Sequence, residues 1–335
     1  MTHMQTTKSR AAMLLTGATG FIGRHLLDLL TSQGVRCRVL VRSCDEFITA
    51  KVPQEDVYKG AIEDSIRNPV VYSDVNTIVH CAARVHTMNE SSSSLLQTYR
   101  QTNRDLTLDL ARRSLNAGIR TFIFVSTVKV MGDFERTEKI LTEDDEPKPT
   151  DPYGISKYEA EKGLTELFSN QDKSRCIILR LPMVYGPGNK GNMLSLLKAA
   201  SKKIPLPLKA VQGKRSMVYV GNVCDAIMKV SSTYQSNQSA TETFFITDGS
   251  DYSSNDLYKE IFSAMHGSNG TFWVPQALLR LPARFNEKAR LIISRLLDDY
   301  RFSSEKLQKK YEWQPRFSFE HGIKETVEWY KKLHM

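Results

Sequence analysis

The feature that most constrains this chain is a glycine pattern that lies between an apolar run and a helical one. Residues 12–15 are apolar, and Thr16-Gly17-x-x-Gly20-x-x-Gly23 follows at once. Residues 21–33 then place apolar side chains at helical spacing. A strand, a tight glycine turn and a helix in this order predict a site for a dinucleotide pyrophosphate, because free N–H groups open the helix.

Each glycine of this pattern has a separate task. Gly17 permits the tight turn, Gly20 lets the backbone come close to the pyrophosphate, and Gly23 lets the helix pack on the strand. The alternative is a plain glycine turn without a ligand. The predicted cofactor-binding residues of this turn are Gly17, Thr19, Gly20, Phe21, Ile22 and Gly23.

The choice between NAD and NADP depends on the residues at the end of the second strand. An acid there bonds the ribose 2′-hydroxyl of NAD, and an arginine pairs with the 2′-phosphate of NADP. The expected strand ends in Arg42-Ser43. A guanidinium matches phosphate as a bidentate donor, so the sequence favours NADP(H). NAD remains possible if Arg42 is a solvated surface charge and Asp45 or Glu46 meets the ribose.

The first half of the chain alternates β-rich runs with helical ones, which is typical of a parallel sheet wound by crossover helices. Residues 95–116 form a long amphipathic pattern, and Gly34 and Gly118 lie where helices are expected to end. The expected strands are 12–15, 36–41, 56–59, 77–80, 121–125 and 176–181.

From Pro182 onward the pattern becomes irregular, and Gly and Pro divide it into loops and short helices. The runs 217–220 and 243–247 are expected to return to the sheet. We therefore expect an α/β fold with two domains. A doubly wound parallel sheet would occupy 11–181 plus 217–247, and a smaller, discontinuous α/β substrate-binding domain would occupy 182–216 plus 248–335.

A second motif far downstream supplies proton-transfer chemistry. Tyr153 and Lys157 are four residues apart and share one face if Tyr153 opens a helix, as the preceding Asp151-Pro152 indicates. A nearby ammonium and a positive nicotinamide lower the pKa of a phenol, so Tyr153 becomes a usable base. The spacing alone is weak. The glycine pattern and Ser126-Thr127 at a strand end make hydride chemistry the leading interpretation.

Composition narrows the remaining classes of function. No apolar run approaches the about 20 residues that span a bilayer, and the polar N-terminus lacks a signal peptide, so we expect a cytoplasmic protein. Five cysteines without Cys-x-x-Cys pairs are expected to be buried thiols, with no structural metal. The net charge of +9 favours an anionic partner. Scattered basic residues argue against nucleic acid.

The chain resembles the extended short-chain dehydrogenase/reductases, specifically the nucleotide-sugar epimerases, dehydratases and reductases, with their Rossmann fold. The similarity runs from about residue 11 to residue 330. The motifs that carry it are 16–23, His80-Cys81-Ala82-Ala83, Asn103, Ser126-Thr127, 153–157, 180–187 and Arg215 before 218–220.

The resemblance implies roles for individual residues. Thr127 would hydrogen-bond the reacting sugar oxygen, and Tyr153 would transfer the proton. Ala82 and Ala83 would line the cofactor cleft, while Lys157 would hold the nicotinamide ribose and tune Tyr153. The family's usual homodimer, formed by the helices 95–116 and 153–170, is also implied.

Substrate residues follow in the same way. Arg215 would hold the diphosphate of a UDP-sugar with its paired N–H donors, assisted by Asn192. Either residue could instead be a surface group. Arg295 or Arg301 could complete the clamp. Tyr185 either lines the sugar pocket or packs in the core.

The chain also departs from the family pattern. Gly60-Ala61-Ile62 follows the third strand where family members often have an acid against adenine, so Ile62 is the residue expected there, and the acidic contact is absent or comes from Asp64. Met183 replaces a common Asn, and Lys129 follows the serine-threonine motif. With the loop 86–89, these changes resemble the subgroup in bacterial surface-polysaccharide (O-antigen) synthesis that acts at C4 of UDP-N-acetylhexosamines.

Residues 278–297 combine apolar and basic side chains at helical spacing. Such a helix can lie on an anionic membrane. The favoured alternative is an amphipathic cover packed on its own domain, so membrane contact is not expected.

The leading function is reduction of a 4-keto UDP-N-acetylhexosamine by NADPH, with Tyr153 as proton donor. The alternative is a UDP-glucose or UDP-N-acetylglucosamine 4-epimerase that retains NAD. A cofactor-sensing regulator without catalysis would have no reason to keep both Tyr153 and Lys157. Reduction of a non-nucleotide carbonyl, such as a sterol, is a further alternative.

Overall fold

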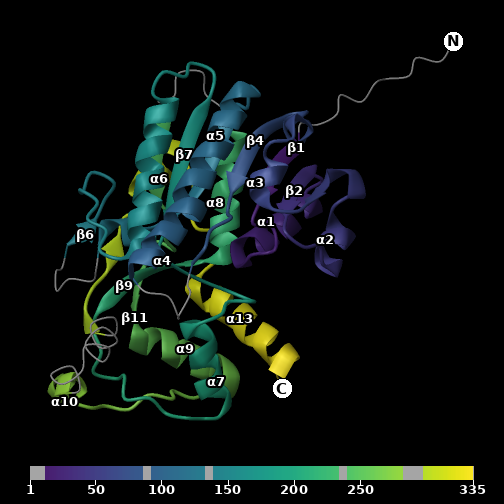
Figure 1. The fold of residues 1–335 in the computed structure, drawn as a ribbon. Coiled ribbons are helices and arrows are strands. Elements are labelled where there is room, and N and C mark those ends of the chain that lie inside the picture. The colour runs from purple at the N-terminus through teal and green to yellow at the C-terminus, as the bar shows by residue number, and fades with distance from the viewer. Residues whose placement is uncertain (1–11, 86–91, 133–138, 234–239, 282–296, 335) are drawn as a thin grey trace. The chain divides into compact units, whose positions relative to one another are not determined.

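The computed structural model describes residues 12–85, 92–132, 139–233, 240–281 and 297–334. Its largest sheet has seven strands in the order β10-β7-β5-β4-β1-β2-β3 (Figure 1). The strands are β1 Ala12–Thr16, β2 Cys37–Val41, β3 Val57–Lys59, β4 Val75–His80, β5 Thr121–Thr127, β7 Arg175–Leu181 and β10 Thr241–Phe245.

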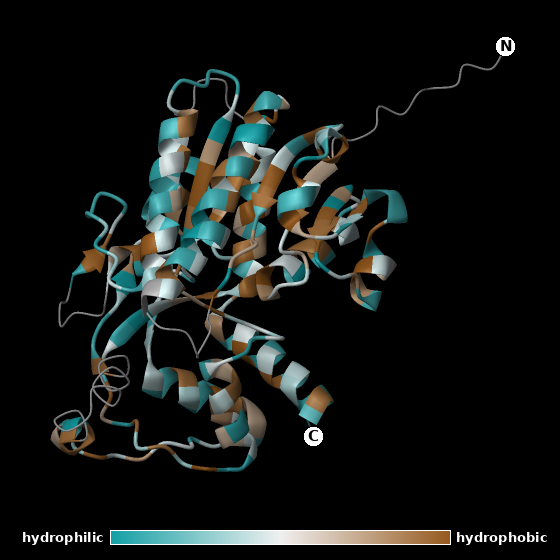
Figure 2. Ribbon diagram, viewed as in Figure 1, coloured by the Kyte–Doolittle hydropathy of each residue, from teal (hydrophilic) through white to brown (hydrophobic). Residues whose placement is uncertain are grey.

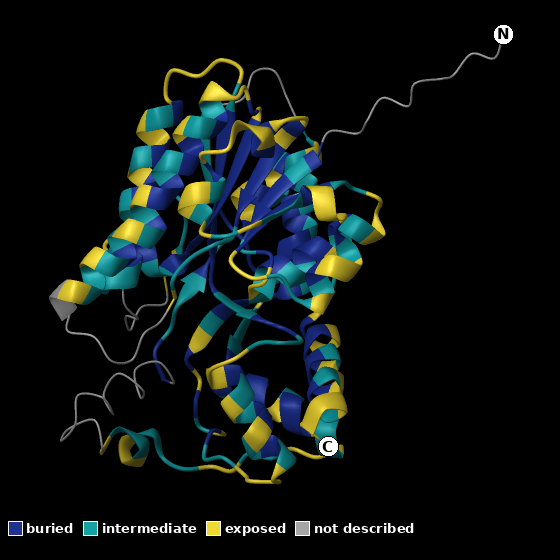
Figure 3. Cartoon of the chain, turned by 45° about the vertical axis from the view of Figure 1, so that its right-hand side comes forward, coloured by how far each residue is buried: buried dark blue, intermediate teal, exposed yellow. Residues whose placement is uncertain are grey.

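The strand order reverses at β1, which has β2 on one side and β4 on the other, and both pairings are parallel. This reversal confirms the expected doubly wound α/β fold, in which ligands bind where the carboxyl ends of neighbouring strands diverge. Every residue of β2, β5 and β7 is buried. Figures 2 and 3 show these strands as largely apolar and enclosed.

The helices begin and end close to the expected positions. Gly34 and Gly118 follow α1 and α5 with φ of 70° and 74°, the left-handed conformation that ends helices. The helices are α1 Phe21–Ser32, α2 Glu46–Lys51, α3 Ile62–Ser65, α4 Ser92–Tyr99, α5 Leu106–Asn116, α6 Pro152–Phe168, α7 Asn192–Ser201, α8 Val220–Ser232, α9 Ser254–His266, α10 Gln276–Arg280, α12 Glu305–Tyr311 and α13 Phe319–His334. The 3-10 turns are η1 Gln54–Asp56, η2 Pro69–Tyr72 and η4 Val128–Met131.

The long helix expected at 95–116 contains an interruption that the sequence pattern did not indicate. A π-helical segment, η3 Arg100–Asp105, lies between α4 and α5. It packs against α6, because Glu159 pairs with Arg100 at 2.6 Å and with Arg104 at 3.1 Å. Further along the two helices, α6 packs closely on α5, because a Cβ on Gly163 would lie only 2.8 Å from the side chain of Leu108. Figure 1 shows α5 and α6 side by side.

The chain divides into two compact units, and each is discontinuous. The first comprises Met1–Val125, Ser156–Ile178 and Tyr234–Glu242, and the second comprises Ser126–Ile155, Leu179–Thr233 and Thr243–Met335. The domain boundaries expected from the sequence stay a prediction.

One strand assignment was wrong. The run 217–220 was expected in the large sheet, but β9 Lys214–Tyr219 lies in a second sheet of order β11-β9-β8. It pairs there with β8 Met183–Tyr185 and β11 Asp251–Ser253, two short strands that the sequence pattern did not indicate. Their pairing depends on segments far apart in the chain. A further pair joins β6 Ile140–Leu141 and β12 Arg301–Phe302.

Candidate functional site

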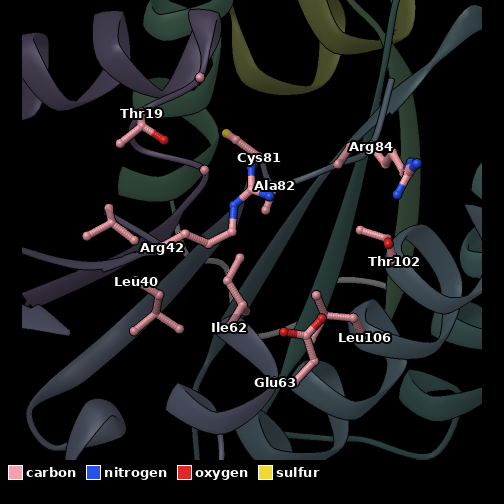
Figure 4. A pocket seen from close by; sticks show the side chains of 14 residues that line it. Thr19, Leu40, Arg42, Ile62, Glu63, Cys81, Ala82, Arg84, Thr102 and Leu106 are labelled. Atoms are coloured by element: carbon pink, nitrogen blue, oxygen red, sulfur yellow. The ribbon is translucent and has the colours of Figure 1, made fainter. Parts of the chain in front are cut away.

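The first compact unit contains a cavity of about 380 Å³ at the carboxyl ends of its strands (Figure 4). This volume falls within the range of ligand sites in proteins. Seven residues predicted to bind the cofactor line it, and they come from four separate segments. They are Gly17, Thr19, Gly20, Arg42, Ile62, Ala82 and Ala83.

The glycine turn has the geometry that the sequence predicts. Gly17 has a φ of +75°, and a Cβ on it would lie 2.6 Å from the backbone nitrogen of Ala82. A Cβ on Gly23 would lie 2.0 Å from the carbonyl oxygen of Gly17. Gly20 is the N-cap of α1 and makes no side-chain cap, so the first turn, with Phe21 and Ile22, keeps N–H groups available to an anion. These glycines form a cradle that fits a pyrophosphate.

Arg42 and Asp45 have different roles in the structure. Arg42 is exposed at the end of β2, and its side chain extends across the cavity (Figure 4). Asp45 instead caps α2 by accepting from the Ile48 amide at 3.1 Å, and it forms an ion pair with Arg24. Those contacts occupy Asp45, one of the two alternative ribose ligands. The other, Glu46, opens α2 and is not among the lining residues.

The acidic residue that lines the cavity is Glu63, which carried no separate signal in the sequence. Asp64, the expected substitute for the missing acid, is not among the lining residues. Both belong to α3, where neighbouring residues point about 100° apart around the axis. Because of this spacing, Glu63 faces the cavity together with Ile62, while Asp64 points to another side of the helix (Figure 4).

A buried polar network supports the loop of residues 81–84. His80 Nδ1 lies 2.6 Å from Thr16 Oγ1, and His80 Nε2 lies 2.9 Å from Thr107 Oγ1. Burial lowers the pKa of His80 to about 3, so the ring is neutral. Thr107 donates its own proton to the Asn103 carbonyl at 2.8 Å, so His80 Nε2–H donates to Thr107 and Nδ1 accepts from Thr16.

The two ends of this network hold the cavity wall. The Ala82 amide donates to Thr16 Oγ1 at 3.3 Å. The Asn103 side chain accepts from the Arg84 amide at 2.9 Å and donates to the Arg84 carbonyl at 3.1 Å and to Ser156 Oγ at 3.1 Å. Of these residues only Ala82 was predicted to line the cofactor cleft, whereas His80 and Asn103 were named only as parts of motifs.

Tyr153 lies half-buried in the first turn of α6, as predicted. Asp151 caps this helix, because its carboxylate accepts from the Gly154 amide at 2.7 Å, and it also pairs with Lys129. Pro152 occupies the first helical position. Lys129, noted in the sequence as a departure, thus holds the cap of the helix that carries Tyr153.

Thr127 ends β5 and is almost completely buried. Its side-chain oxygen accepts from the Lys129 amide at 3.3 Å at the start of η4. Tyr300 secures this turn, because its hydroxyl lies 2.8 Å from the Val128 carbonyl and 2.7 Å from the Gly132 carbonyl. Tyr300 carried no local signal in the sequence, because it lies 172 residues from Val128 in the chain.

Lys157 follows Tyr153 by one helical turn and is 1% exposed. Its ammonium donates to the Val125 carbonyl at 2.7 Å and lies 3.8 Å from the centre of the Phe124 ring. Desolvation by burial lowers the pKa of Lys157 to about 7, while Glu161 and Cys81 oppose the shift. Lys157 is not among the residues that line the cofactor cavity.

The second compact unit has a cavity of its own, of about 510 Å³. Arg215 from β9 and Asn192 from the first turn of α7 both line it, so the structure brings the two expected diphosphate residues together. Ser253 and Ser254, at the start of α9, are there too. A guanidinium and helix N-termini are groups that bind phosphate. The remaining lining is mostly aliphatic and includes Met183.

The other expected substrate residues do not line this cavity. Tyr185 is fully buried and donates to Asp248 at 2.7 Å, so of its two alternatives the structure shows core packing. Burial also raises the pKa of Tyr185. Arg301 lies in β12 and is not in the lining, whereas Arg295 and the loop 86–89 lie outside the described residues.

Among the described residues, no three His, Cys, Asp or Glu side chains are placed to hold a metal ion. Within the same residues, no helix is both long and apolar enough to cross a bilayer. Cys37, Cys176 and Cys224 are buried free thiols as expected, but Cys44 and Cys81 are only partly covered. Cys81 faces the cofactor cavity.

The chain is similar in sequence to known sugar 4-epimerases. The chain is 31% identical over 322 residues to a UDP-glucose 4-epimerase of Vibrio cholerae, with 96% of each chain covered. It is 27% identical to an N-acetyl-α-D-glucosaminyl-diphospho-ditrans,octacis-undecaprenol 4-epimerase of Escherichia coli O157:H7, over 79% of this chain and 76% of the relative.

Known structures share the fold. A UDP-glucuronic acid 4-epimerase from Bacillus cereus in complex with NAD has a TM-score of 0.74 at 18% identity, over 97% of this chain and 100% of the other. A UDP-glucose 4-epimerase from Thermotoga maritima with UDP-glucose has the same TM-score at 22% identity and the same coverage. The NAD dependent epimerase/dehydratase family model matches residues 13–244. With this match and the glycine cradle, the chain belongs to the NAD dependent epimerase/dehydratase family, whose members use a nicotinamide cofactor.

Proposed function

We propose that this protein transfers hydride at C4 of a UDP-linked hexose and that its reaction is 4-epimerisation. The observation that carries the proposal is the pairing of two sites in one chain. One is a glycine cradle that fits a dinucleotide, and the other is a cavity that combines Arg215 with the N-terminus of α7. The relatives named UDP-glucose 4-epimerase support the choice of reaction.

The chain's own residues would divide the work at the sugar. Tyr153 would take the proton of the 4-hydroxyl and return it, and the Thr127 hydroxyl would hydrogen-bond the same oxygen. A charged Lys157 one turn further along α6 would favour the phenolate, because a neighbouring positive charge stabilises the ionised form of Tyr153. The bound nicotinamide would accept the C4 hydride and supply it again.

The second cavity would hold the nucleotide end of the substrate. Arg215 and the first turn of α7 would bind the diphosphate, and the aliphatic lining would exclude water from the remaining surface. Met183 faces this cavity where relatives commonly have Asn, so the contacts made here would differ from theirs. The restriction to UDP-N-acetylhexosamines, the role in surface-polysaccharide synthesis and the α5–α6 homodimer are also proposals.

A second candidate is reduction of a 4-keto UDP-sugar by NADPH, and Arg42 favours it. The guanidinium reaches into the cofactor cavity where a 2′-phosphate would be recognised, while Asp45 is engaged by Arg24 and the α2 cap. Net reduction consumes the cofactor, so a reductase needs NADPH that exchanges with solvent. An epimerase returns the hydride and can keep its cofactor.

One experiment separates the two candidates. The purified protein is denatured to release and identify its nucleotide, and the native protein is incubated with UDP-N-acetylglucosamine or UDP-glucose without added cofactor. Retained NAD and a C4-inverted product are the expected results. Exchangeable NADPH that is oxidised only with a 4-keto sugar would establish the reductase. If no nicotinamide nucleotide is released and no sugar nucleotide is converted, the proposal is wrong.

The role of Tyr153 is tested by Tyr153→Phe, which removes only the hydroxyl. Loss of the acid/base group is expected to lower kcat by about a thousandfold, within the range for general acid–base catalysis, with little change in KM. Tyr158→Phe, on the same helix and half-exposed, is the matched control and should retain full activity. A Tyr153→Phe enzyme as active as Tyr158→Phe would assign the proton transfer to another group.

A further inference from the structure

Exposed apolar side chains gather in two segments of the second compact unit. Among the described residues, nine large apolar side chains are exposed, and five of the nine belong to residues 202–209 and 270–281. Trp273 is the most exposed of the five, at 63%. Burial of such groups is favourable, so a concentration of them marks an interaction surface. The five are Ile204, Phe272, Trp273, Leu278 and Leu281.

The two segments run side by side and are joined by hydrogen bonds. The Leu206 amide donates to the Gly270 carbonyl and the Phe272 amide to the Leu206 carbonyl, both at 3.0 Å. The Lys209 amide donates to the Phe272 carbonyl at 3.1 Å. The Gln276 side chain then donates to the Ala210 carbonyl at 2.7 Å, at the start of α10 (Figure 1). We call residues 202–209 and 270–281 the basic apolar surface.

The charge around this surface has one sign. Residues 198–217 and 267–281 contain seven basic residues and no acidic one, whereas the whole chain of 335 residues has a net charge of +9. Lys214 pairs with Asp256 and Arg280 with Asp298. Within the described residues, the exposed side chains of Lys202, Lys203 and Lys209 form no ion pair. Their charges are available to an anionic partner.

We propose that the basic apolar surface docks on an anionic lipid bilayer. Trp and Phe prefer the boundary between lipid and water, and lysines beside them are attracted to acidic headgroups. A second copy of the chain fits less well, because the same positive surface would face itself. The amphipathic pattern of 278–297 mostly lies outside the described residues, but Leu278 and Leu281 at its start are 54% and 42% exposed.

The exposed apolar side chains of this surface are separate from the side chains that line the substrate cavity. Leu206, Leu208 and Leu279 line that cavity from the same segments, but none of the five exposed apolar residues does. Substitutions on the outside can therefore test lipid binding without removing cavity-lining side chains. The inference does not depend on which sugar reaction the protein catalyses.

The test is sedimentation of the full-length protein with vesicles. One set contains equal amounts of phosphatidylglycerol and phosphatidylcholine, and the other contains phosphatidylcholine alone. Binding is expected to the anionic vesicles at low salt and to weaken as salt is added. The triple variant Lys202→Gln, Lys203→Gln, Lys209→Gln is expected to bind about a hundredfold more weakly, from about fivefold for each basic residue at the surface. Trp273→Ser is also expected to bind more weakly.

Matched controls change exposed groups elsewhere. Lys173→Gln, Lys324→Gln, Lys332→Gln removes the same charge, and Leu333→Ser removes a side chain that is 63% exposed, like Trp273. Both should bind as the unchanged protein does, and all variants should keep its thermal unfolding and sugar-nucleotide turnover. The proposal is wrong if the unchanged protein ignores anionic vesicles at low salt, or if both triple variants bind equally. A change of oligomeric state in Trp273→Ser would assign the surface to self-association.

Discussion

The environment of Lys157 departs from what its place in the chain suggests. Its neighbours in sequence predict only that it lies on a helix, yet its ammonium is buried against the Val125 carbonyl and the face of Phe124. Burial disfavours the charged form, so the pKa falls from 10.5 to about 7. In the proposed reaction this charge would support the phenolate of Tyr153. A pKa near neutrality makes that support dependent on pH.

This shift predicts a pH dependence of stability in the protein without cofactor. Below about pH 7 both the folded and unfolded states hold the Lys157 proton, so the cost of burying the charge is constant. Between about 7 and 10.5 the unfolded state binds more protons, so stability rises with pH by up to about 1.4 kcal/mol per unit. Lys157→Met should lack this rise, as measured by urea unfolding at several pH values.

A control on the same helix makes the comparison specific. Lys162 is exposed, and Lys162→Met should follow the pH dependence of the unchanged protein. The other titrating groups are common to all three proteins and cancel in the difference. Parallel curves for Lys157→Met and the unchanged protein would mean that Lys157 titrates alike in the folded and unfolded states.

At the scale of elements, the turn between β1 and α1 is the clearest case of local sequence determining structure. A strand, three spaced glycines and a helical pattern were enough to place β1, the turn and α1 almost to the residue. The same holds for α6, where Asp151 and Pro152 mark the start. Such elements depend on neighbouring residues only, and their signals are therefore present in the sequence.

The turn supports a prediction about Gly23. Alanine is intrinsically better than glycine in a helix by about 1 kcal/mol, but a Cβ here would lie 2.0 Å from the Gly17 carbonyl oxygen. Backbone atoms cannot move aside cheaply, so Gly23→Ala is expected to lose about 3 kcal/mol of stability and at least tenfold in cofactor affinity. Chemical unfolding and a nucleotide titration measure the two effects.

Gly34 provides the matched control, since it has a φ of +70° and a Cβ added there would meet no atom within 4 Å. Gly34→Ala should lose only about 1 to 2 kcal/mol, from the left-handed backbone, and bind nucleotide normally. If Gly23→Ala matched the unchanged protein in both measurements, the close packing of α1 on the turn would be refuted.

Other elements needed information from distant segments. The run 217–220 was apolar enough for either sheet, and its partners β8 and β11 are short strands with weak patterns. The π-helical segment η3 likewise lies where the long helix meets Glu159 of α6. Hydrophobic periodicity shows that a segment is a strand or a helix, but not which partner it pairs with.

For the whole molecule, the two ligand cavities belong to different compact units. Each is lined by residues of its own unit, so each ligand should bind through its own set of contacts. UDP at about a hundred times its Kd is expected to stabilise the fold by about 2.7 kcal/mol, and to raise Tm by about 4 °C. NADP or NAD should produce a comparable rise through the other cavity.

Two arginine variants test this independence by thermal unfolding. Arg215→Ala should lose the rise with UDP and keep the rise with dinucleotide. Arg42→Ala should keep the rise with UDP and show a smaller rise with NADP than the unchanged protein does, because the guanidinium that would pair with the 2′-phosphate is gone. If either variant lost both rises, the assignment of one ligand to each cavity would fail.

The sequence by itself determined the fold class, the glycine cradle, the start of the Tyr153 helix and the family, because these depend on residues that are neighbours in the chain. Tertiary structure alone decided that Glu63 rather than Asp64 faces the cofactor cavity, that Tyr185 is buried against Asp248, and that Leu278 and Leu281 are exposed. Burial, and with it the low pKa of Lys157, is a property of segments brought together from far apart. No local pattern records it.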